Sequence, residues 1–204
     1  MKNNEFRNNK KNRLHTLVKI AILSALATVI MLLEFPLAFI APPFYKLDLS
    51  EAVILIGGFA LGPVPALIIE LIKNLLNLLI NGTVTGCVGE LANFLTGASF
   101  TVTASLIYKY KKTIKGAILS CVIGIASLTV LSAFFNYFIV VPIYASMFGG
   151  IDSIVSLGTA VNPMVNNLAT FVVICVVPFN ALKGLICSVI AFLLYKRVSP
   201  ILHI

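Results

Sequence analysis

Long apolar stretches constrain this chain more than any other feature of its sequence. Several of them approach or exceed the roughly 20 residues that an α-helix needs to cross the hydrocarbon core of a bilayer. Only 11% of the residues are charged, whereas a soluble domain usually carries about 25%. The stretches are apolar on all sides, and the strands of a membrane barrel would instead alternate polar and apolar residues. We therefore predict an all-α integral membrane protein that lies in a lipid bilayer.

The apolar stretches and the breaks between them predict a six-transmembrane-helix bundle. We place its helices near residues 16–35, 50–61, 63–80, 88–108, 115–141 and 166–195. They form a single membrane domain at 15–197, between a polar basic tail at 1–14 and a short C-terminal tail at 198–204. A tight turn at Gly62-Pro63 separates the second helix from the third. Because the second helix is short for a membrane span, we expect neighbouring helices to shield it.

Basic residues predict the orientation of the bundle. They gather before the first helix, between the fourth and fifth helices and after the sixth helix, at Lys2, Arg7, Lys10, Lys11, Arg13, Lys19, Lys109, Lys111, Lys112, Lys115, Lys196 and Arg197. By the positive-inside rule these segments face the cytoplasm. Both termini are then cytoplasmic, and the long loop at 34–51 between the first two helices is extracellular, where it can act as a lid. The orientation accounts for the net charge of +8, and no motif indicates a nucleic-acid partner.

Polar residues inside the last helix indicate a binding site. Asn180 and Lys183 are three residues apart and therefore share one face of that helix, and Pro178 just before them removes a backbone hydrogen bond. A charge at the centre of a membrane helix costs about 2.5–3.5 kcal/mol, so such residues usually face a bundle interior or a cavity. Two interpretations are open for Lys183: a salt bridge to another helix, or the floor of an outward-facing pocket.

The pocket interpretation includes the outer end of the fifth helix. We expect Asn136 and Asn180 to flank the pocket and the loop at 36–48 to cover it. An asparagine presents a donor and an acceptor side by side. The site would therefore suit a flat, mostly uncharged ligand whose edge alternates C=O and N–H groups. The walls would come from Phe134, Phe135, Tyr137 and Phe138.

Other polar groups in the helices have structural explanations. Glu70 and Lys73 are three residues apart and are expected to form an internal ion pair. Asp48, Ser50 and Glu51 open the second helix, whose N-terminus favours acidic side chains. The chain lacks the motifs of a metal site, of a nucleophile elbow and of an ATP-binding phosphate loop. We therefore expect neither a catalytic site nor a bound metal.

Four segments together resemble a known family. They are "AILSALATV" in the first helix, "KLDLSEAVILIGGFALGPVPALIIELIKNLL" across the second and third, "NYFIVVPIY" in the fifth and "PFNALKG" in the sixth. These segments are similar to those of the substrate-binding S components of energy-coupling factor (ECF) transporters, and in particular to the riboflavin branch. The resemblance implies that Asn136, Asn180 and Lys183 hydrogen-bond the isoalloxazine ring of riboflavin.

The resemblance assigns roles to two further groups of residues. The segment with Leu47, Asp48 and Glu51 matches the region near the ribityl chain of the ligand. Ala21 and Ala25 match an A-x-x-x-A motif that packs against the membrane-embedded coupling subunit. Small residues four positions apart let another helix approach closely in a membrane. Without the resemblance, packing inside the bundle would be the preferred interpretation of these alanines.

The resemblance implies a subunit that captures riboflavin outside the cell and delivers it inward after docking on a separate ATP-hydrolysing module. Its partners would be a coupling subunit of the EcfT type and two ATPase subunits of the EcfA type, in the cytoplasmic membrane of a bacterium. Riboflavin would be the transported ligand, and no cofactor is expected.

Several alternatives to this function remain open. The chain could be an S component for another vitamin or for flavin mononucleotide, whose phosphate would point toward the lid and Lys46. It could also be a solitary transporter driven by ions through Glu70, Glu90 or Asp48. An intramembrane enzyme that uses Lys183 or Glu70 is a further alternative.

Overall fold

The computed structural model describes residues 2–83 and 85–202 of this mostly helical chain. The last two residues of the predicted C-terminal tail, 203–204, lie outside the described residues. The helices are α1 (Lys2–Met31), α2 (Ser50–Leu61), α3 (Pro63–Asn81), α4 (Val88–Tyr110), α5 (Ile114–Phe135), α6 (Val141–Met147), α7 (Ile151–Val161), α8 (Leu168–Phe171) and α9 (Val177–Leu202). Two π-helical segments (Asn136–Val140 and Val172–Val176) precede α6 and α9, and two short strands, β1 (Phe35–Pro36) and β2 (Lys46–Leu47), lie between α1 and α2.

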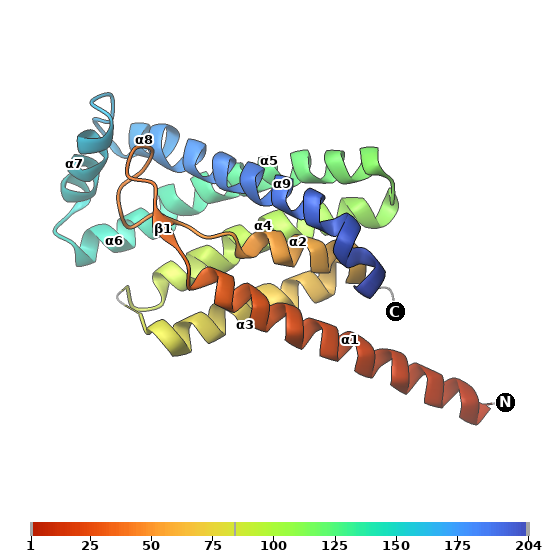
Figure 1. The fold of residues 1–204 in the computed structure, drawn as a ribbon. Coiled ribbons are helices and arrows are strands. Elements are labelled where there is room, and N and C mark those ends of the chain that lie inside the picture. The colour runs from red at the N-terminus through yellow and green to blue at the C-terminus, as the bar shows by residue number, and fades with distance from the viewer. Residues whose placement is uncertain (1, 84, 203–204) are drawn as a thin grey trace.

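The long helices run side by side along the axis of an elongated bundle (Figure 1). The start of α1 and the end of α9 lie toward one end of this bundle, and α6 and α7 lie at the other end. Because α1 begins at Lys2 and α9 ends at Leu202, the described parts of both predicted tails continue the helices beside them.

Five helical stretches are long and apolar enough to cross a membrane: Arg13–Met31, Pro63–Asn81, Val88–Tyr110, Ile114–Met147 and Leu168–Tyr195. They coincide with five of the six predicted spans. The remaining span is α2, whose 12 residues rise only about 18 Å along a helix. The residues of α2 from Ser50 to Phe59 are all buried, and α2 packs against α1, α3, α4 and α9. Neighbouring helices therefore shield α2 as expected, while the count of six spans remains a prediction.

The predicted break between the second and third helices is confirmed at Gly62. This residue has a φ of +102°, a conformation that residues with a Cβ atom rarely adopt. Pro63 follows as the first residue of α3, a position where the missing N–H of proline leaves no helical hydrogen bond unmade. The pair therefore ends α2 and starts α3 with no intervening loop.

The two helices that carry the predicted asparagines each contain a π-helical segment followed by a proline. Asn136–Val140 ends two residues before Pro142, and Val172–Val176 ends two residues before Pro178. A proline cannot donate a hydrogen bond to the carbonyl four residues earlier. The helix widens where this bond is missing, and such π-helical segments are frequent at functional sites. The sequence predicted the lost bond at Pro178 but not the continuous widened helix.

The loop between α1 and α2 is held by a small antiparallel ladder. Phe35 lies opposite Leu47, and Pro36 lies opposite Lys46. Beside the ladder, Lys46 Nζ lies 2.6 Å from Glu34 Oε1 in an ion pair. The prediction of an all-α chain did not include this ladder, which closes residues 37–45 into a compact lid.

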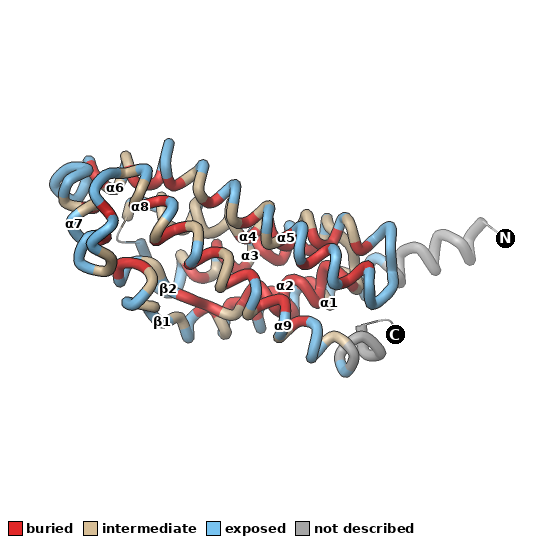
Figure 2. Tube along the Cα trace, turned by 90° about the horizontal axis from the view of Figure 1, so that it is seen from above, coloured by how far each residue is buried: buried red, intermediate tan, exposed pale blue. Residues whose placement is uncertain are grey.

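Buried residues follow the axis of the bundle (Figure 2) and form two apolar clusters. One cluster joins α1, α2, α3, α4, α5 and α9 and includes Ile54 and Phe100. The other joins the lid to α6, α7 and the start of α9, and includes Val141 and Phe171. Polar side chains are buried as well, among them Asp48, Glu51, Glu70, Lys73, Asn74, Asn136, Asn180 and Lys183.

Candidate binding pocket and buried charge network

A cavity of about 440 Å³ lies at the end of the bundle that carries the lid and α7. Its volume is within the roughly 300–1,000 Å³ that is typical of small-molecule sites. The wall combines aromatic, amide, hydroxyl and charged side chains, among them Phe44, Tyr45, Asn77, Glu90, Asn93, Thr96, Tyr144 and Phe179. Such a lining suits an organic ligand with an aromatic part and several polar groups.

Four of the predicted site residues line this cavity: Asp48, Asn136, Asn180 and Lys183. All four are buried. They come from the segment before α2, from the π-helical segment after α5 and from α9. Asp48 and Lys183 are 135 positions apart in the chain, so only the folded bundle brings these groups together.

The other predicted site residues do not line the cavity. Leu47 packs in the apolar cluster beneath the lid. Glu51 lies deeper in the bundle, where its Oε1 atom is 3.0 Å from Lys73 Nζ. Ala21 and Ala25 are exposed on the surface of α1, which leaves them free to contact another helix.

The predicted aromatic walls are not found at this cavity. Phe134, Phe135, Tyr137 and Phe138 are absent from its lining, and three of the four are exposed. Asn136 faces inward, and residues one or two positions away on a helix point in other directions. The aromatic walls come instead from the lid, α6 and α9, through Phe44, Tyr45, Tyr144, Phe148 and Phe179.

Lys183 forms the floor of the cavity and is also paired with carboxylates. Its Nζ atom lies 2.8 Å from Asp48 Oδ2 and 3.5 Å from Glu51 Oε1. The predicted salt bridge is therefore present, and the same ammonium group lines the cavity, while the outward-facing binding pocket remains a prediction. Burial acts to raise the pKa of the Asp48 carboxyl, but the ammonium groups of Lys183 and Lys73 outweigh it and hold that pKa below its usual range. Asp48 also accepts a hydrogen bond from the Ser50 amide at the start of α2, at 3.0 Å.

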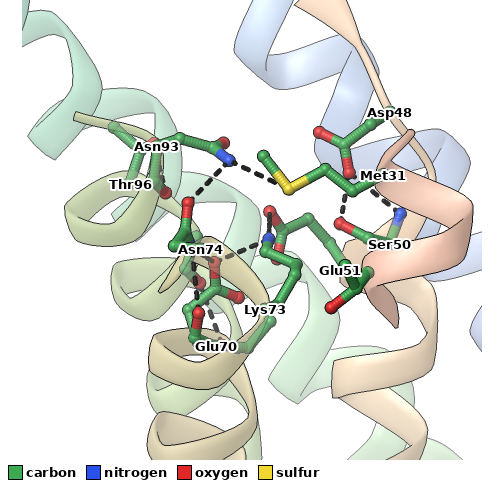
Figure 3. Close-up of polar contacts among 12 residues, drawn as sticks. Met31, Asp48, Ser50, Glu51, Glu70, Lys73, Asn74, Asn93 and Thr96 are labelled. Atoms are coloured by element: carbon green, nitrogen blue, oxygen red, sulfur yellow. Dashed lines mark hydrogen bonds and ion pairs between the residues drawn. The ribbon is translucent and has the colours of Figure 1, made fainter. Parts of the chain in front are cut away.

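From Lys183 a network of ion pairs continues through Glu51 into the bundle, where Figure 3 shows Glu51, Lys73 and Glu70 close together. Glu51 Oε1 accepts a hydrogen bond from Lys73 Nζ at 3.0 Å. Lys73 Nζ also lies 2.7 Å from Glu70 Oε1, three residues earlier on α3. The predicted ion pair between Glu70 and Lys73 is therefore present, but Lys73 is shared with α2 rather than satisfied by α3 alone.

Two amide side chains, on Asn74 and Asn93, extend this network (Figure 3), and contacts of Lys183 close it into a ring. Asn74 Nδ2 donates to Glu70 Oε1 at 2.9 Å, and Asn93 Nδ2 donates to Asn74 Oδ1 at 3.1 Å. Lys183 Nζ in turn donates to Asn93 Oδ1 at 3.5 Å. The ring joins α2, α3, α4 and α9, so the pocket floor and the packing of four helices depend on the same contacts.

The buried network contains more acidic groups than basic ones. Three carboxylates, on Asp48, Glu51 and Glu70, face the two ammonium groups of Lys73 and Lys183. If all were ionised the network would carry one net negative charge, and one bound proton would make it neutral. Among the described residues, no three histidine, cysteine or carboxylate side chains are placed to hold a metal ion.

Tyr45 of the lid reaches into the cavity and contacts a predicted ligand-binding amide. Its hydroxyl donates to Asn136 Oδ1 at 2.6 Å. Burial raises the pKa of the Tyr45 phenol, so the hydroxyl stays protonated as a donor. The amide groups of Asn136 and Asn180 each donate to the carbonyl four residues earlier, on Ser132 and Val176. These bonds fix both amides at the cavity wall.

Several polar residues of the lining were not predicted from the sequence. Asn77, Asn93 and Thr96 lie in α3 and α4 and line the cavity. Asn93 and Thr96 are three residues apart inside an apolar stretch, which is the same signal that identified Asn180 and Lys183. Tyr45 gave no such signal, because a loop has no helical periodicity.

A family model described as "ECF transporter, substrate-specific component" matches residues 15–195. The chain belongs to this family. As a substrate-specific component it is a transporter subunit in a membrane and not an enzyme. The family resemblance stated from the sequence motifs is therefore confirmed.

Individual relatives cover nearly the whole chain. "Riboflavin transporter RibU" of Staphylococcus aureus is 38% identical over 186 residues, which is 91% of either chain. "Riboflavin transporter FmnP" of Bacillus subtilis is 31% identical over 90% of this chain and 92% of its own length. A solved structure, described as that of the S component of a bacterial ECF transporter, matches with a TM-score of 0.74 and 34% identity. The match covers 93% of this chain and 98% of that chain.

The charge balance of the network predicts unequal effects of two substitutions. Lys73→Met leaves two buried carboxylates without their shared ammonium group and should destabilise the fold by about 3–5 kcal/mol. Glu70→Gln keeps an oxygen that can accept from Lys73 and Asn74 and removes the surplus charge, so it should melt close to the parent. Thermal unfolding in detergent can be followed with a thiol-reactive dye, because three of the four cysteines are buried. Equal decreases in melting temperature for Lys73→Met and Glu70→Gln would contradict the charge argument.

Gly97 of α4 lies against the same carboxylates. A Cβ atom at this position would lie 2.5 Å from Glu70 Oε1 and 2.8 Å from Glu51 Oε1, so Gly97→Ala should displace both groups and lower the melting temperature. The loss should be smaller when Glu70→Ala is also present, because that change removes one of the clashing carboxylates. Additive losses in the double variant would show that the glycine is needed for another reason.

Proposed function

We propose that this chain captures riboflavin for an ECF transporter. The observation that carries the proposal is the convergence of Asn136, Asn180, Lys183 and Asp48 on one cavity of about 440 Å³. The relatives from Staphylococcus aureus and Bacillus subtilis, both named riboflavin transporters, support the choice of ligand.

The lining fits the two parts of riboflavin. The ring edge alternates carbonyl groups and nitrogens, and the amides of Asn136 and Asn180 offer donors and acceptors side by side. Lys183 adds a charged donor, which forms stronger hydrogen bonds than a neutral one. Aromatic side chains such as Phe179 and Tyr144 can stack on the flat ring. We assign the ring to these five residues.

The ribityl chain carries several hydroxyl groups and needs a polar surface. Asp48, Asn77, Asn93 and Thr96 provide one along the lining. The resemblance placed Leu47 and Glu51 near the ribityl chain. In this proposal they support the polar surface without lining the cavity, because Leu47 packs under the lid and Glu51 forms an ion pair with Lys183.

The Tyr45 hydroxyl donates a hydrogen bond to the side-chain oxygen of Asn136, which the riboflavin ring would use in this proposal. Riboflavin binding would then exchange the 2.6 Å contact between the Tyr45 hydroxyl and Asn136 Oδ1 for a contact with the ligand. This exchange would move the lid, whose base is held by the ladder of β1 and β2.

The distribution of charge supports a membrane orientation. Lys109, Lys111, Lys112 and Lys115 surround the turn between α4 and α5, at the end of the bundle where α1 starts and α9 ends (Figure 1). By the positive-inside rule this end is cytoplasmic, and the cavity at the other end opens outward. The proposal is a six-span subunit of a bacterial cytoplasmic membrane with both termini inside.

The proposed partners are a coupling subunit of the EcfT type and two ATPase subunits of the EcfA type. Ala21 and Ala25 lie exposed on α1, where small side chains permit close contact with another membrane helix. They are proposed to contact the coupling subunit. Riboflavin is the transported ligand in this proposal and not a cofactor.

Substitutions in the pocket test the ligand. Asn180→Ala and Lys183→Ala each remove a polar partner from a desolvated site, at a cost of about 1–3 kcal/mol, so affinity should fall by about 5- to 150-fold. The measurement is quenching of riboflavin fluorescence by the purified protein, together with the visible absorption spectrum of protein purified without added ligand. Asn166→Ala, which changes an exposed amide outside the cavity lining, is the matched control.

Two outcomes would contradict this assignment. Unchanged riboflavin affinity in both pocket variants would show that Asn180 and Lys183 do not bind the ring. If the parent protein is colourless and also fails to quench riboflavin fluorescence, its family membership would stand, but its ligand would be another vitamin. Because Lys183→Ala also leaves Asp48 without its partner, its melting temperature must be recorded beside its affinity.

The exposed alanines of α1 test the coupling contact. Ala21→Leu should leave riboflavin binding unchanged and strongly reduce uptake by cells that contain the coupling module, because a bulky side chain prevents close helix contact. Ala126→Leu makes the same change at an exposed position of α5 and should support normal uptake. Equal uptake by the two variants would place the coupling surface elsewhere.

A further inference from the structure

Acidic residues outnumber basic residues in the cavity lining. Three carboxylates and two ammonium groups line the cavity, on Glu34, Lys46, Asp48, Glu90 and Lys183. The lining therefore carries one net negative charge when these groups are ionised. What matters for a ligand is which of these charges are already paired.

Both lysines of the lining form ion pairs with carboxylates. Lys46 Nζ lies 2.6 Å from Glu34 Oε1. Lys183 Nζ lies 2.8 Å from Asp48 Oδ2 and 3.5 Å from Glu51 Oε1. Among the described residues of the lining, no positive charge is left without an acidic partner.

Glu90 is the carboxylate that remains. It lies in the first turn of α4, at the end of a helix where acidic side chains are commonly found. Its Oε2 atom accepts a hydrogen bond from Thr83 Oγ1 at 3.1 Å. No lysine or arginine within the described parts of the chain forms an ion pair with it, so its charge is uncompensated at the cavity wall.

We propose that Glu90 and the Glu34–Lys46 pair make this pocket select the uncharged flavin against its phosphorylated form. The inference rests on the proposed function and names the charge of its substrate. A phosphate monoester carries about −1.5 to −2 charges at neutral pH, and this lining offers it a like charge and no free cation. Selectivity then comes from a repulsive group as well as from attractive contacts.

The same geometry revises the expectation for Lys46. The sequence suggested that Lys46 could meet the phosphate of flavin mononucleotide. In the structure its ammonium group is held by Glu34, so a phosphate would have to displace that carboxylate. Glu34 therefore acts on selectivity through Lys46, as a positioning residue, while Glu90 acts through its own charge.

The test compares two ligands that differ only by the phosphate. Dissociation constants of riboflavin and flavin mononucleotide are measured by fluorescence quenching on the full-length protein, and their ratio is the readout. The parent should bind riboflavin at least about tenfold more tightly. Glu90→Gln should reduce this preference several-fold, and Glu34→Gln should reduce it further because it frees Lys46. High salt should narrow the preference in the parent, since ions screen exposed charges.

A matched control separates local from general charge effects. Asp152→Asn removes one acidic charge from α7 at an exposed position that does not line the cavity, and it should leave the ratio unchanged. Equal affinity of the parent for both flavins would overturn the inference and leave the proposed function standing. A preference that survives both Glu90→Gln and Glu34→Gln would also overturn it, in favour of a steric cause. A parent that binds neither flavin would overturn both.

Discussion

The contact between Lys183 and Asp48 is the interaction on which the rest of the site depends. A charge within a membrane helix is costly unless it is paired or faces a polar cavity, and Lys183 meets both conditions. Its pairing with Asp48 fixes α9 against the segment before α2. Through Glu51 and Lys73 the same contacts reach α3. The pocket lining and the packing of the helices therefore form one electrostatic unit, in which removal of either lysine leaves buried carboxylates without their ammonium partner.

The backbone prepares the other half of the site. Pro142 and Pro178 each follow a π-helical segment, and the asparagines of the pocket lie at or just after these segments. Each asparagine is then tied to a carbonyl of its own helix. A side chain that is already ordered loses little freedom when a ligand binds, so more of its hydrogen-bond energy contributes to affinity. The lid adds a further donor, because the Tyr45 hydroxyl donates to Asn136 Oδ1.

The sequence predicted the long helices and the core of the site for physical reasons that can be named. Apolar stretches of membrane length leave few alternatives to helices, and Asn180 with Lys183 stood out because polar groups are rare in such stretches. The aromatic walls were wrong, because nearness to Asn136 in sequence says little about which side of a helix faces inward. The sharing of Lys73 with α2 could not be predicted, since a partner three residues away already accounted for its charge. Tyr45 was missed because loops lack a periodic pattern.

The pairing of Lys183 with Asp48 also limits how such a pocket can change its ligand over evolutionary time. Replacing Lys183 to suit a molecule of different polarity would leave the buried Asp48 carboxylate without this ion pair. Replacing Asp48 first would take the same ion pair from the buried Lys183 ammonium group. Either single step lowers stability before any new ligand is gained. A change of ligand polarity at this pair therefore requires two substitutions that arrive close together, whereas Glu90, which lines the cavity and forms no ion pair among the described residues, can vary alone. Diversification of ligand charge should accordingly begin at lining residues that form no ion pair and reach the Lys183–Asp48 pair last.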